Sequence, residues 1–155
     1  MKTSLFRICM VLALILVISP TVLRAQGKGN LEGVWNITVT VTDCQTGAPI
    51  RTVHALQLFH QDGTFQETAN TASRGISLGV WSPDGAKTYK ANYWFYRYKP
   101  DGTFASLAKA TNNIMLNHDG TLTTAGLIQD FDATGALIST GCVVHQGIRL
   151  ASADQ

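Results

Sequence analysis

Two pairs of residues in this chain have side chains suited to chemistry. His54 and His145 are imidazoles, which are common metal ligands. Asp130 and Asp132 are two residues apart, so on a strand both carboxylates would share one face and could act as an acid–base pair. No carboxylate or third histidine is placed with the two imidazoles, and the aspartates lie near a turn, where such charges are usually solvated. We therefore expect no metal site and no catalysis by this aspartate pair.

Motifs of the common enzyme classes do not occur in the sequence. It contains no Gly-x-Ser-x-Gly, no His-Glu-x-x-His and no phosphate-binding loop. The sequence thus predicts no catalytic residue and no cofactor.

The first 25 residues have the pattern of a secretory signal peptide. Lys2 and Arg7 give a basic start, residues 8–18 are almost continuously apolar, and a cleavage site follows before Gln26. The apolar run is shorter than the roughly 20 residues that span a membrane. We expect residues 1–25 to be removed and residues 26–155 to form one domain, secreted or periplasmic. An uncleaved anchor is the alternative.

The charge of the remaining domain argues against nucleic acid as a partner. Lys2, Arg7 and Arg24 leave with the leader, so the formal net charge falls from +2 to −1. No stripe of lysine and arginine remains. We therefore expect no nucleic-acid binding. No later segment approaches the roughly 20 apolar residues that span a membrane, so we also expect no membrane association after cleavage. The sequence makes no prediction of oligomeric state.

The two cysteines of the remaining domain, Cys44 and Cys142, are predicted to form a disulfide. Their number is even and the expected compartment is oxidising. The bridge would tie the beginning of the domain to its end. The alternative is a pair of buried free thiols.

A recurring turn pattern indicates the fold class. Asp-Gly-Thr occurs at 62–64, 101–103 and 119–121, between runs of apolar and β-branched residues, and Asp-Gly is typical of tight hairpins. Eight strands are predicted, at about 33–43, 51–60, 64–70, 76–82, 87–98, 103–116, 120–132 and 136–150. Because short hairpins join antiparallel neighbours, we expect an all-β, eight-stranded, antiparallel up-and-down β-barrel.

The cysteines also predict which side chains face the interior. If Cys44 and Cys142 lie opposite each other, paired residue numbers sum to 186, and Trp35 and Arg149 share the inner face while the cysteines lie outside. We further expect paired numbers in the first hairpin to sum to about 95, which turns four more side chains inward: His54, Leu56, Leu58 and His60. His54 and His145 would then be about 9–10 Å apart, too far to share a metal without leaning.

The densest aromatic segment is Tyr93-Trp94-Phe95-Tyr96. Alternation along a strand sends Tyr93 and Phe95 to one face and the other two rings to the opposite face. We expect the first pair inside the barrel and the second pair on the outer surface, where it could form an interface.

Gly33-Val34-Trp35 at the start of the first strand, the eight-stranded meander and Arg149 near the end of the last strand resemble the lipocalin-like, or calycin, barrels. The resemblance implies that Trp35 packs at a closed end with Arg149 across its ring. It also implies non-catalytic binding of a small apolar or amphipathic molecule in the barrel. The expected lining residues are His54, Leu56, Leu58, Tyr93, Phe95 and His145.

Two alternative functions remain open at this point. One is a packed structural or interaction module that uses the outer aromatic face. The other is a small barrel enzyme of the isomerase or cyclase type.

Overall fold

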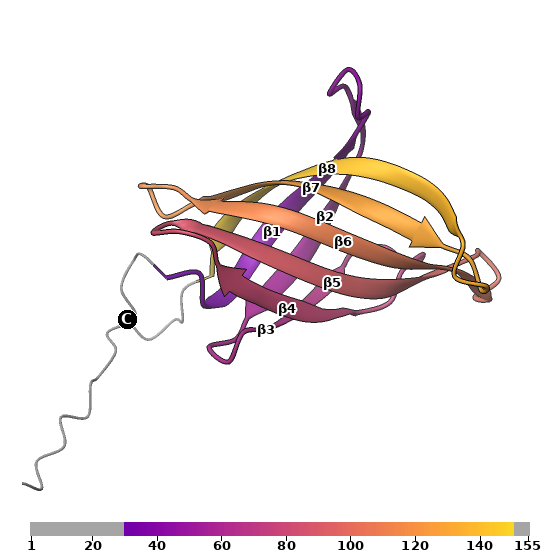
Figure 1. Ribbon diagram of the computed structural model, residues 1–155, viewed down its shortest axis with the longest axis horizontal. Helices are drawn as coiled ribbons and strands as arrows, with labels where there is room; N and C mark the ends of the chain where they lie inside the picture. Colours follow the sequence, from indigo (N-terminus) through magenta and orange to yellow (C-terminus); the bar gives the residue numbers. More distant parts are fainter. Residues whose placement is uncertain (1–29, 151–155) are drawn as a thin grey trace, which may run out of the picture.

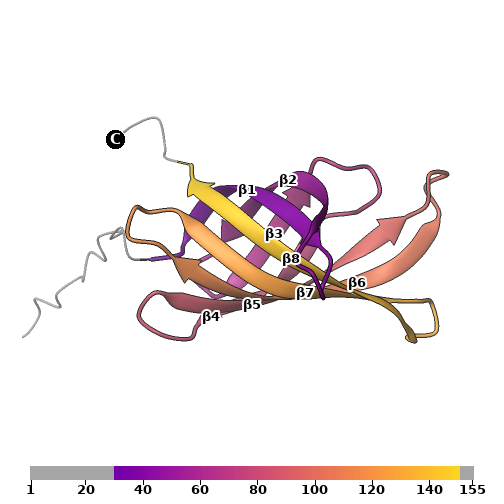
Figure 2. The same ribbon diagram turned by 90° about the horizontal axis from the view of Figure 1, so that it is seen from above.

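The computed structural model describes residues 30–150. The proposed leader, residues 1–25, lies outside this part of the chain. The eight strands are β1 Gly33–Thr42, β2 Pro49–Phe59, β3 Thr64–Ala69, β4 Ser77–Pro83, β5 Thr88–Tyr98, β6 Phe104–Leu116, β7 Leu122–Phe131 and β8 Leu137–Arg149. They form one closed antiparallel barrel in chain order, as Figures 1 and 2 show, consistent with a calycin-like fold. The predicted fold class is confirmed. Residues 30–150 include no helix long and apolar enough to cross a membrane.

The three Asp-Gly-Thr segments lie at hairpin tips, as predicted. At the first tip Gly63 has φ +85°, and Asp62 Oδ1 accepts hydrogen bonds from the backbone N–H and the hydroxyl of Thr64 at 2.9 and 2.6 Å. The same contacts join Asp101 to Thr103 and Asp119 to Thr121. These hydrogen bonds to threonine lower the pKa of all three aspartates. Each turn therefore uses glycine for the backbone bend and aspartate to fix the start of the next strand.

The two ends of the barrel differ in composition. At one end, where the odd-numbered strands begin, large rings fill the interior: Trp35, Phe59, Phe65, Trp81 and Tyr89. The last four of these rings are in contact, with centroid distances of 5.0 to 5.9 Å, within the range of favourable aromatic contacts. We call this the Trp35 end. The opposite end, where the odd-numbered strands finish, is called the Arg97 end.

The barrel closes between β1 and β8, with Trp35 directly opposite Arg149. The guanidinium carbon of Arg149 lies 4.5 Å from the Trp35 ring centroid, and the guanidinium also donates to the carbonyls of Asn30 and Glu32. Trp35 Nε1 donates to the carbonyl of Leu31 at 2.8 Å. The expected contact between Trp35 and Arg149 is confirmed.

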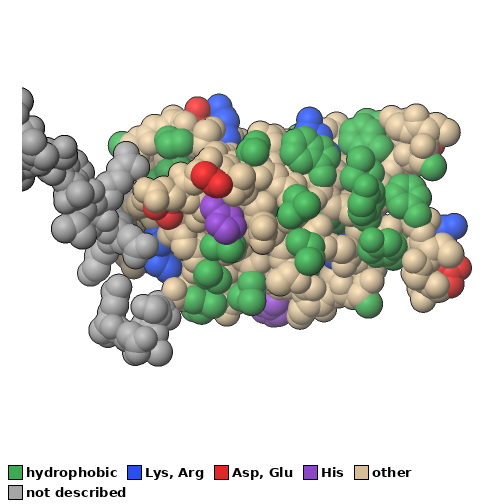
Figure 3. All heavy atoms as spheres, turned by 90° about the horizontal axis from the view of Figure 1, so that it is seen from below, with side chains coloured by type: hydrophobic (Ala, Val, Ile, Leu, Met, Phe, Trp, Pro, Cys, Tyr) green, Lys and Arg blue, Asp and Glu red, His purple; other side chains and the backbone are tan. Residues whose placement is uncertain are grey.

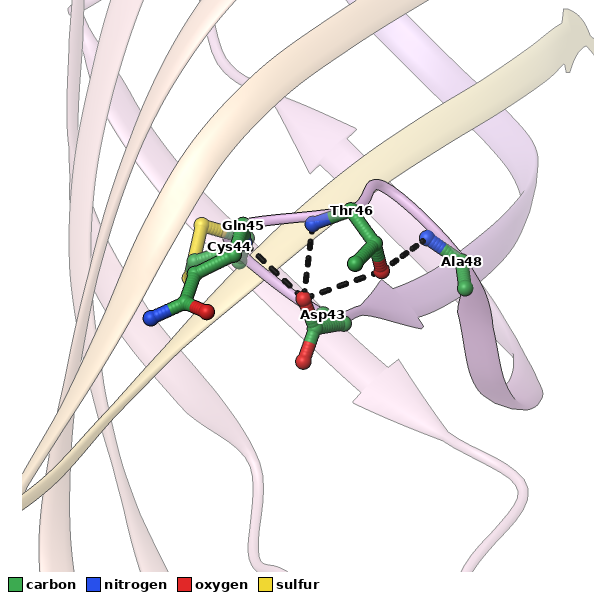
Figure 4. The surroundings of a disulfide bond; sticks show 6 residues. Asp43, Cys44, Gln45, Thr46 and Ala48 are labelled. Carbon is green, nitrogen blue, oxygen red and sulfur yellow. Dashed lines mark hydrogen bonds between the residues drawn. A yellow bond between two sulfur atoms is a disulfide. The ribbon is translucent and has the colours of Figure 1, made fainter.

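Cys44 and Cys142 form a disulfide with a Cα–Cα distance of 5.2 Å. Cys142 pairs with Thr42 rather than with Cys44, which lies just beyond β1 in the turn of Figure 4. Paired numbers therefore sum to 184 instead of 186, an even shift that leaves every side chain on its expected face. In that turn Asp43 Oδ1 accepts from the backbone N–H groups of Gln45 and Thr46.

The expected register of the first hairpin is wrong. Val39 pairs with Val53 and Thr38 with His54, so paired numbers sum to 92 instead of about 95. An odd shift moves every side chain of the strand to the other face. His54 and Leu56 are exposed and Leu58 shares their outer face, whereas the neighbouring Ala55 and Gln57 are buried.

Candidate functional site

A layer of polar side chains crosses the interior of the barrel. Its members come from seven of the strands and from one connection, and each is less than a tenth exposed: Gln57, Glu67, Arg74, Ser77, Tyr93, Asn112, Thr124 and His145. We call this set the polar layer. Buried polar groups are normally hydrogen-bonded, because an unpaired one loses its interaction with water and gains nothing. The pairing within the layer therefore decides what it can do.

An ion pair between Glu67 and Arg74 lies on one side of the polar layer. Glu67 also accepts hydrogen bonds from Gln57 Nε2 at 2.6 Å and from the Ser77 hydroxyl at 3.2 Å. The Arg74 guanidinium carbon lies 3.6 Å from the centroid of the Phe95 ring. The charge of each member is thus balanced inside the barrel, which a buried ion needs to be tolerated.

Arg74 reaches the interior because the connection between β3 and β4 is pinned to the end of β5. The N–H of Gly75 donates to the carbonyl of Tyr96, and the N–H of Tyr98 donates to the carbonyl of Ser73, both at 2.9 Å. These contacts form an isolated bridge between Arg74 and Arg97. The connection therefore extends the sheet and carries a cation into the barrel.

On the other side of the layer, Asn112 joins β6 to both of its neighbours. Asn112 Nδ2 donates to the Tyr93 hydroxyl at 3.0 Å. Asn112 Oδ1 lies over Gly126 of β7, only 1.9 Å from where a Cβ atom on that glycine would be. Glycine is required at this position to admit the amide. Burial, helped by the nearby Glu67 carboxylate, raises the pKa of Tyr93 well above its ordinary value.

Thr124 and His145 lie directly opposite each other on β7 and β8 and both face inward. Burial lowers the pKa of His145 from 6.5 to about 4, so its ring is uncharged near neutral pH. Five buried side-chain atoms have no hydrogen-bond partner within residues 30–150: Arg74 Nε, Asn112 Oδ1, Thr124 Oγ1, His145 Nδ1 and His145 Nε2. The polar layer thus carries hydrogen-bonding capacity that the described protein does not use.

Between the polar layer and solvent, the Arg97 end combines a second ion pair with apolar side chains. Arg97 Nε donates to Asp130 at 2.6 Å, and Asp130 also accepts from the hydroxyls of Ser106 and Ser139. The apolar side chains that pack against the core here are only partly buried: Val41, Val53 and Ala69. A Cβ atom on the nearby Gly141 of β8 would meet no atom within 4 Å.

Two grooves lie on the outer face of β1 and β2. One, of about 350 Å³, is lined by Leu56, Thr68 and Asn70, and the other, of about 430 Å³, by Thr38, Gln146 and Ile148; both include Asn36 and His54. Their lining combines apolar side chains with amide, hydroxyl and imidazole groups, and none of it belongs to the polar layer.

The structure separates the six residues expected to line the barrel. Tyr93, Phe95 and His145 are buried in the interior, each 2 % exposed. His54, Leu56 and Leu58 face outward because of the register of the first hairpin. Sequence reasoning missed the six other members of the polar layer: Gln57, Glu67, Arg74, Ser77, Asn112 and Thr124. Glu67 alternates with Phe65 and Ala69 along β3, a pattern that could have revealed its inward position. No pattern in the sequence around Arg74 indicates that its side chain enters the barrel.

Within residues 30–150 no group of three or more histidine, cysteine, aspartate or glutamate side chains is arranged to hold a metal ion. No family model matches the chain, and none of the curated proteins matches it. The geometry of the barrel interior therefore carries the functional argument.

Proposed function

We propose that this protein is a lipocalin-like barrel that binds a small amphipathic molecule without catalysis. The ligand lies inside the barrel toward the Arg97 end. One observation carries the proposal: the interior holds five buried polar atoms that no described residue pairs. A ligand that supplies the missing hydrogen bonds would gain affinity from atoms that are already desolvated.

The surroundings of these atoms support an amphipathic rather than a purely polar ligand. Val41, Val53 and Ala69 provide apolar contacts at the Arg97 end. At the Trp35 end the interior is filled by aromatic rings and covered by Arg149. A ligand therefore approaches from the Arg97 end, with its polar group toward the polar layer.

Native mass spectrometry of the protein purified from its own source tests this function. The expected result is a one-to-one complex with a small organic molecule that dissociates under activation. A spectrum that contains only the mass of the disulfide-bonded polypeptide would contradict the proposal.

We also propose that the protein is exported by a cleaved leader. The disulfide between Cys44 and Cys142 is compatible with an oxidising compartment. Sequencing the N-terminus of the protein recovered from the periplasm or the medium is expected to begin at Gln26. A chain that retains residues 1–25 would contradict this proposal.

A second candidate function is favoured by the outer face of β4 to β6. Trp94 lies opposite Leu78 and is 41 % exposed, and the Tyr96 and Phe104 rings are in contact at 6.1 Å between centroids. Hydrophobic side chains gather toward the Arg97 end of the face in Figure 3. Such a patch is typical of an interface, here between copies of this chain. Sedimentation velocity should then show a dimer that Trp94→Ser with Tyr96→Ser abolishes, whereas a monomer at all concentrations would rule it out.

A further inference from the structure

The unpaired atoms of the polar layer include both hydrogen-bond donors and acceptors. Arg74 Nε–H and the protonated ring nitrogen of His145 are donors, while Asn112 Oδ1 and the other ring nitrogen of His145 are acceptors. The Thr124 hydroxyl can act in either role. A carbonyl group would serve only the donors and leave Asn112 Oδ1 unpaired. A hydroxyl group has one donor and two acceptor lone pairs, so a single hydroxyl can serve an acceptor and a donor of this set at the same time.

Three of these side chains face the same part of the interior. Thr124 and His145 are directly opposite on β7 and β8, a relation that places their Cβ atoms about 4.5–5.5 Å apart. Asn112 reaches over Gly126, which is two residues from Thr124 on the same face of β7. The three side chains therefore occupy neighbouring inward positions on β6, β7 and β8.

The charges inside the barrel are already balanced. Glu67 is paired with Arg74, and Arg97 is paired with Asp130. The remaining members of the polar layer are uncharged near neutral pH, His145 included. A carboxylate or ammonium group placed here would lack a free counter-charge, and burying an unpaired ion is strongly unfavourable.

From this arrangement we infer that the ligand is an uncharged amphipathic alcohol, whose hydroxyl binds between Asn112, Thr124 and His145 and whose apolar part extends toward Val41, Val53 and Ala69. The inference rests on the proposed function and deepens it by naming the ligand class. The hydroxyl donates to Asn112 Oδ1 and accepts from Thr124 or His145.

Competition between two molecules of equal chain length tests the ligand class. Decanol and decanoate are each titrated in competition with the neutral fluorophore phenylnaphthylamine at about pH 7. Decanol is expected to bind at least about tenfold more tightly than decanoate, because only the carboxylate carries an uncompensated charge. Decanoate binding as tightly as decanol would overturn the inference and leave the proposed function standing. If neither molecule nor the fluorophore binds, the proposed function itself fails.

A matched pair of variants tests the location of the hydroxyl. Thr124→Val keeps the shape of a buried side chain and removes one unpaired hydroxyl, whereas Thr123→Val makes the same change on the outer face. Thr124→Val is expected to weaken decanol binding about fivefold, the effect of one hydrogen bond, without lowering the urea midpoint. Thr123→Val is expected to leave binding unchanged. Equal decanol affinity in both variants would overturn this placement.

Discussion

His145 is 2 % exposed. The charged groups that interact electrostatically with its imidazole are Glu67 and Arg74, and these two are already paired with each other. Burial is the main reason that its pKa falls to about 4. An unfolded chain would instead protonate its histidines near pH 6.5. Between these two values the unfolded state binds a proton that the folded state does not accept.

This difference predicts a pH-dependent stability. The contribution of His145 is fully present above about pH 6.5 and is lost as the pH falls toward 4, because proton uptake then favours the unfolded state. The full effect is on the order of 3 kcal/mol. Urea unfolding at neutral pH and near pH 4.5 measures it in the wild type and in His145→Gln. The variant should lose less stability on acidification, and an identical loss in both proteins would show that His145 is not buried as a neutral ring.

Single residues also show how far alternation predicts the interior. Tyr93 and Phe95 are buried as expected, since they alternate with two exposed rings on one continuous strand. The inward position of Arg74 depends on hydrogen bonds between the connection before β4 and the distant end of β5. Such pairing between distant segments cannot be predicted from the local sequence.

Among the structural elements, the hairpin turns are the most directly encoded. Gly102 has φ +83°, and a Cβ atom there would meet no neighbour within 4 Å. Any loss of folding stability caused by a side chain at this position therefore comes from the backbone conformation alone.

Gly102→Val should lower the free energy of unfolding by roughly 1 kcal/mol or more, because a β-branched residue resists positive φ. Gly102→Asn is the control, since asparagine tolerates the left-handed region better than other side chains. Denaturant midpoints measure both changes. Equal midpoints for the two variants would be incompatible with this turn geometry.

The first hairpin shows where prediction from sequence fails at the level of elements. The register shifts between Val41 and Thr42, and the turn that follows is closed by Asp43, whose N–H donates to the carbonyl of Ala48. The bulge and the turn length together set the register, and neither is evident from composition. The β1–β8 pairing was predicted with the correct faces because the two cysteines constrain it independently.

At the scale of the whole molecule, two contacts join the first strand to the last. The disulfide lies where β1 ends, and the Trp35–Arg149 contact lies where β1 begins. Together they hold both ends of the closing seam.

The contact between Trp35 and Arg149 is expected to be cooperative. Arg149→Ala removes the attraction to the indole and the hydrogen bonds to Asn30 and Glu32. A double-mutant cycle with Trp35→Phe should give a coupling energy of about 0.5–2 kcal/mol. Additive effects in this cycle would mean that the Arg149 guanidinium stabilises the barrel only through its hydrogen bonds to the carbonyls of Asn30 and Glu32, and not through the Trp35 ring.

The central claim is that a ligand binds inside the barrel and not on its outer surface. NMR titration of the protein with decanol compares the methyl groups of Thr124 and Val143, which are buried inside, with those of Leu56 and Ile148, which line the outer grooves. We predict saturable shifts of the Thr124 and Val143 methyl signals, with the outer methyl signals unchanged. Shifts confined to Leu56 and Ile148 would contradict the claim.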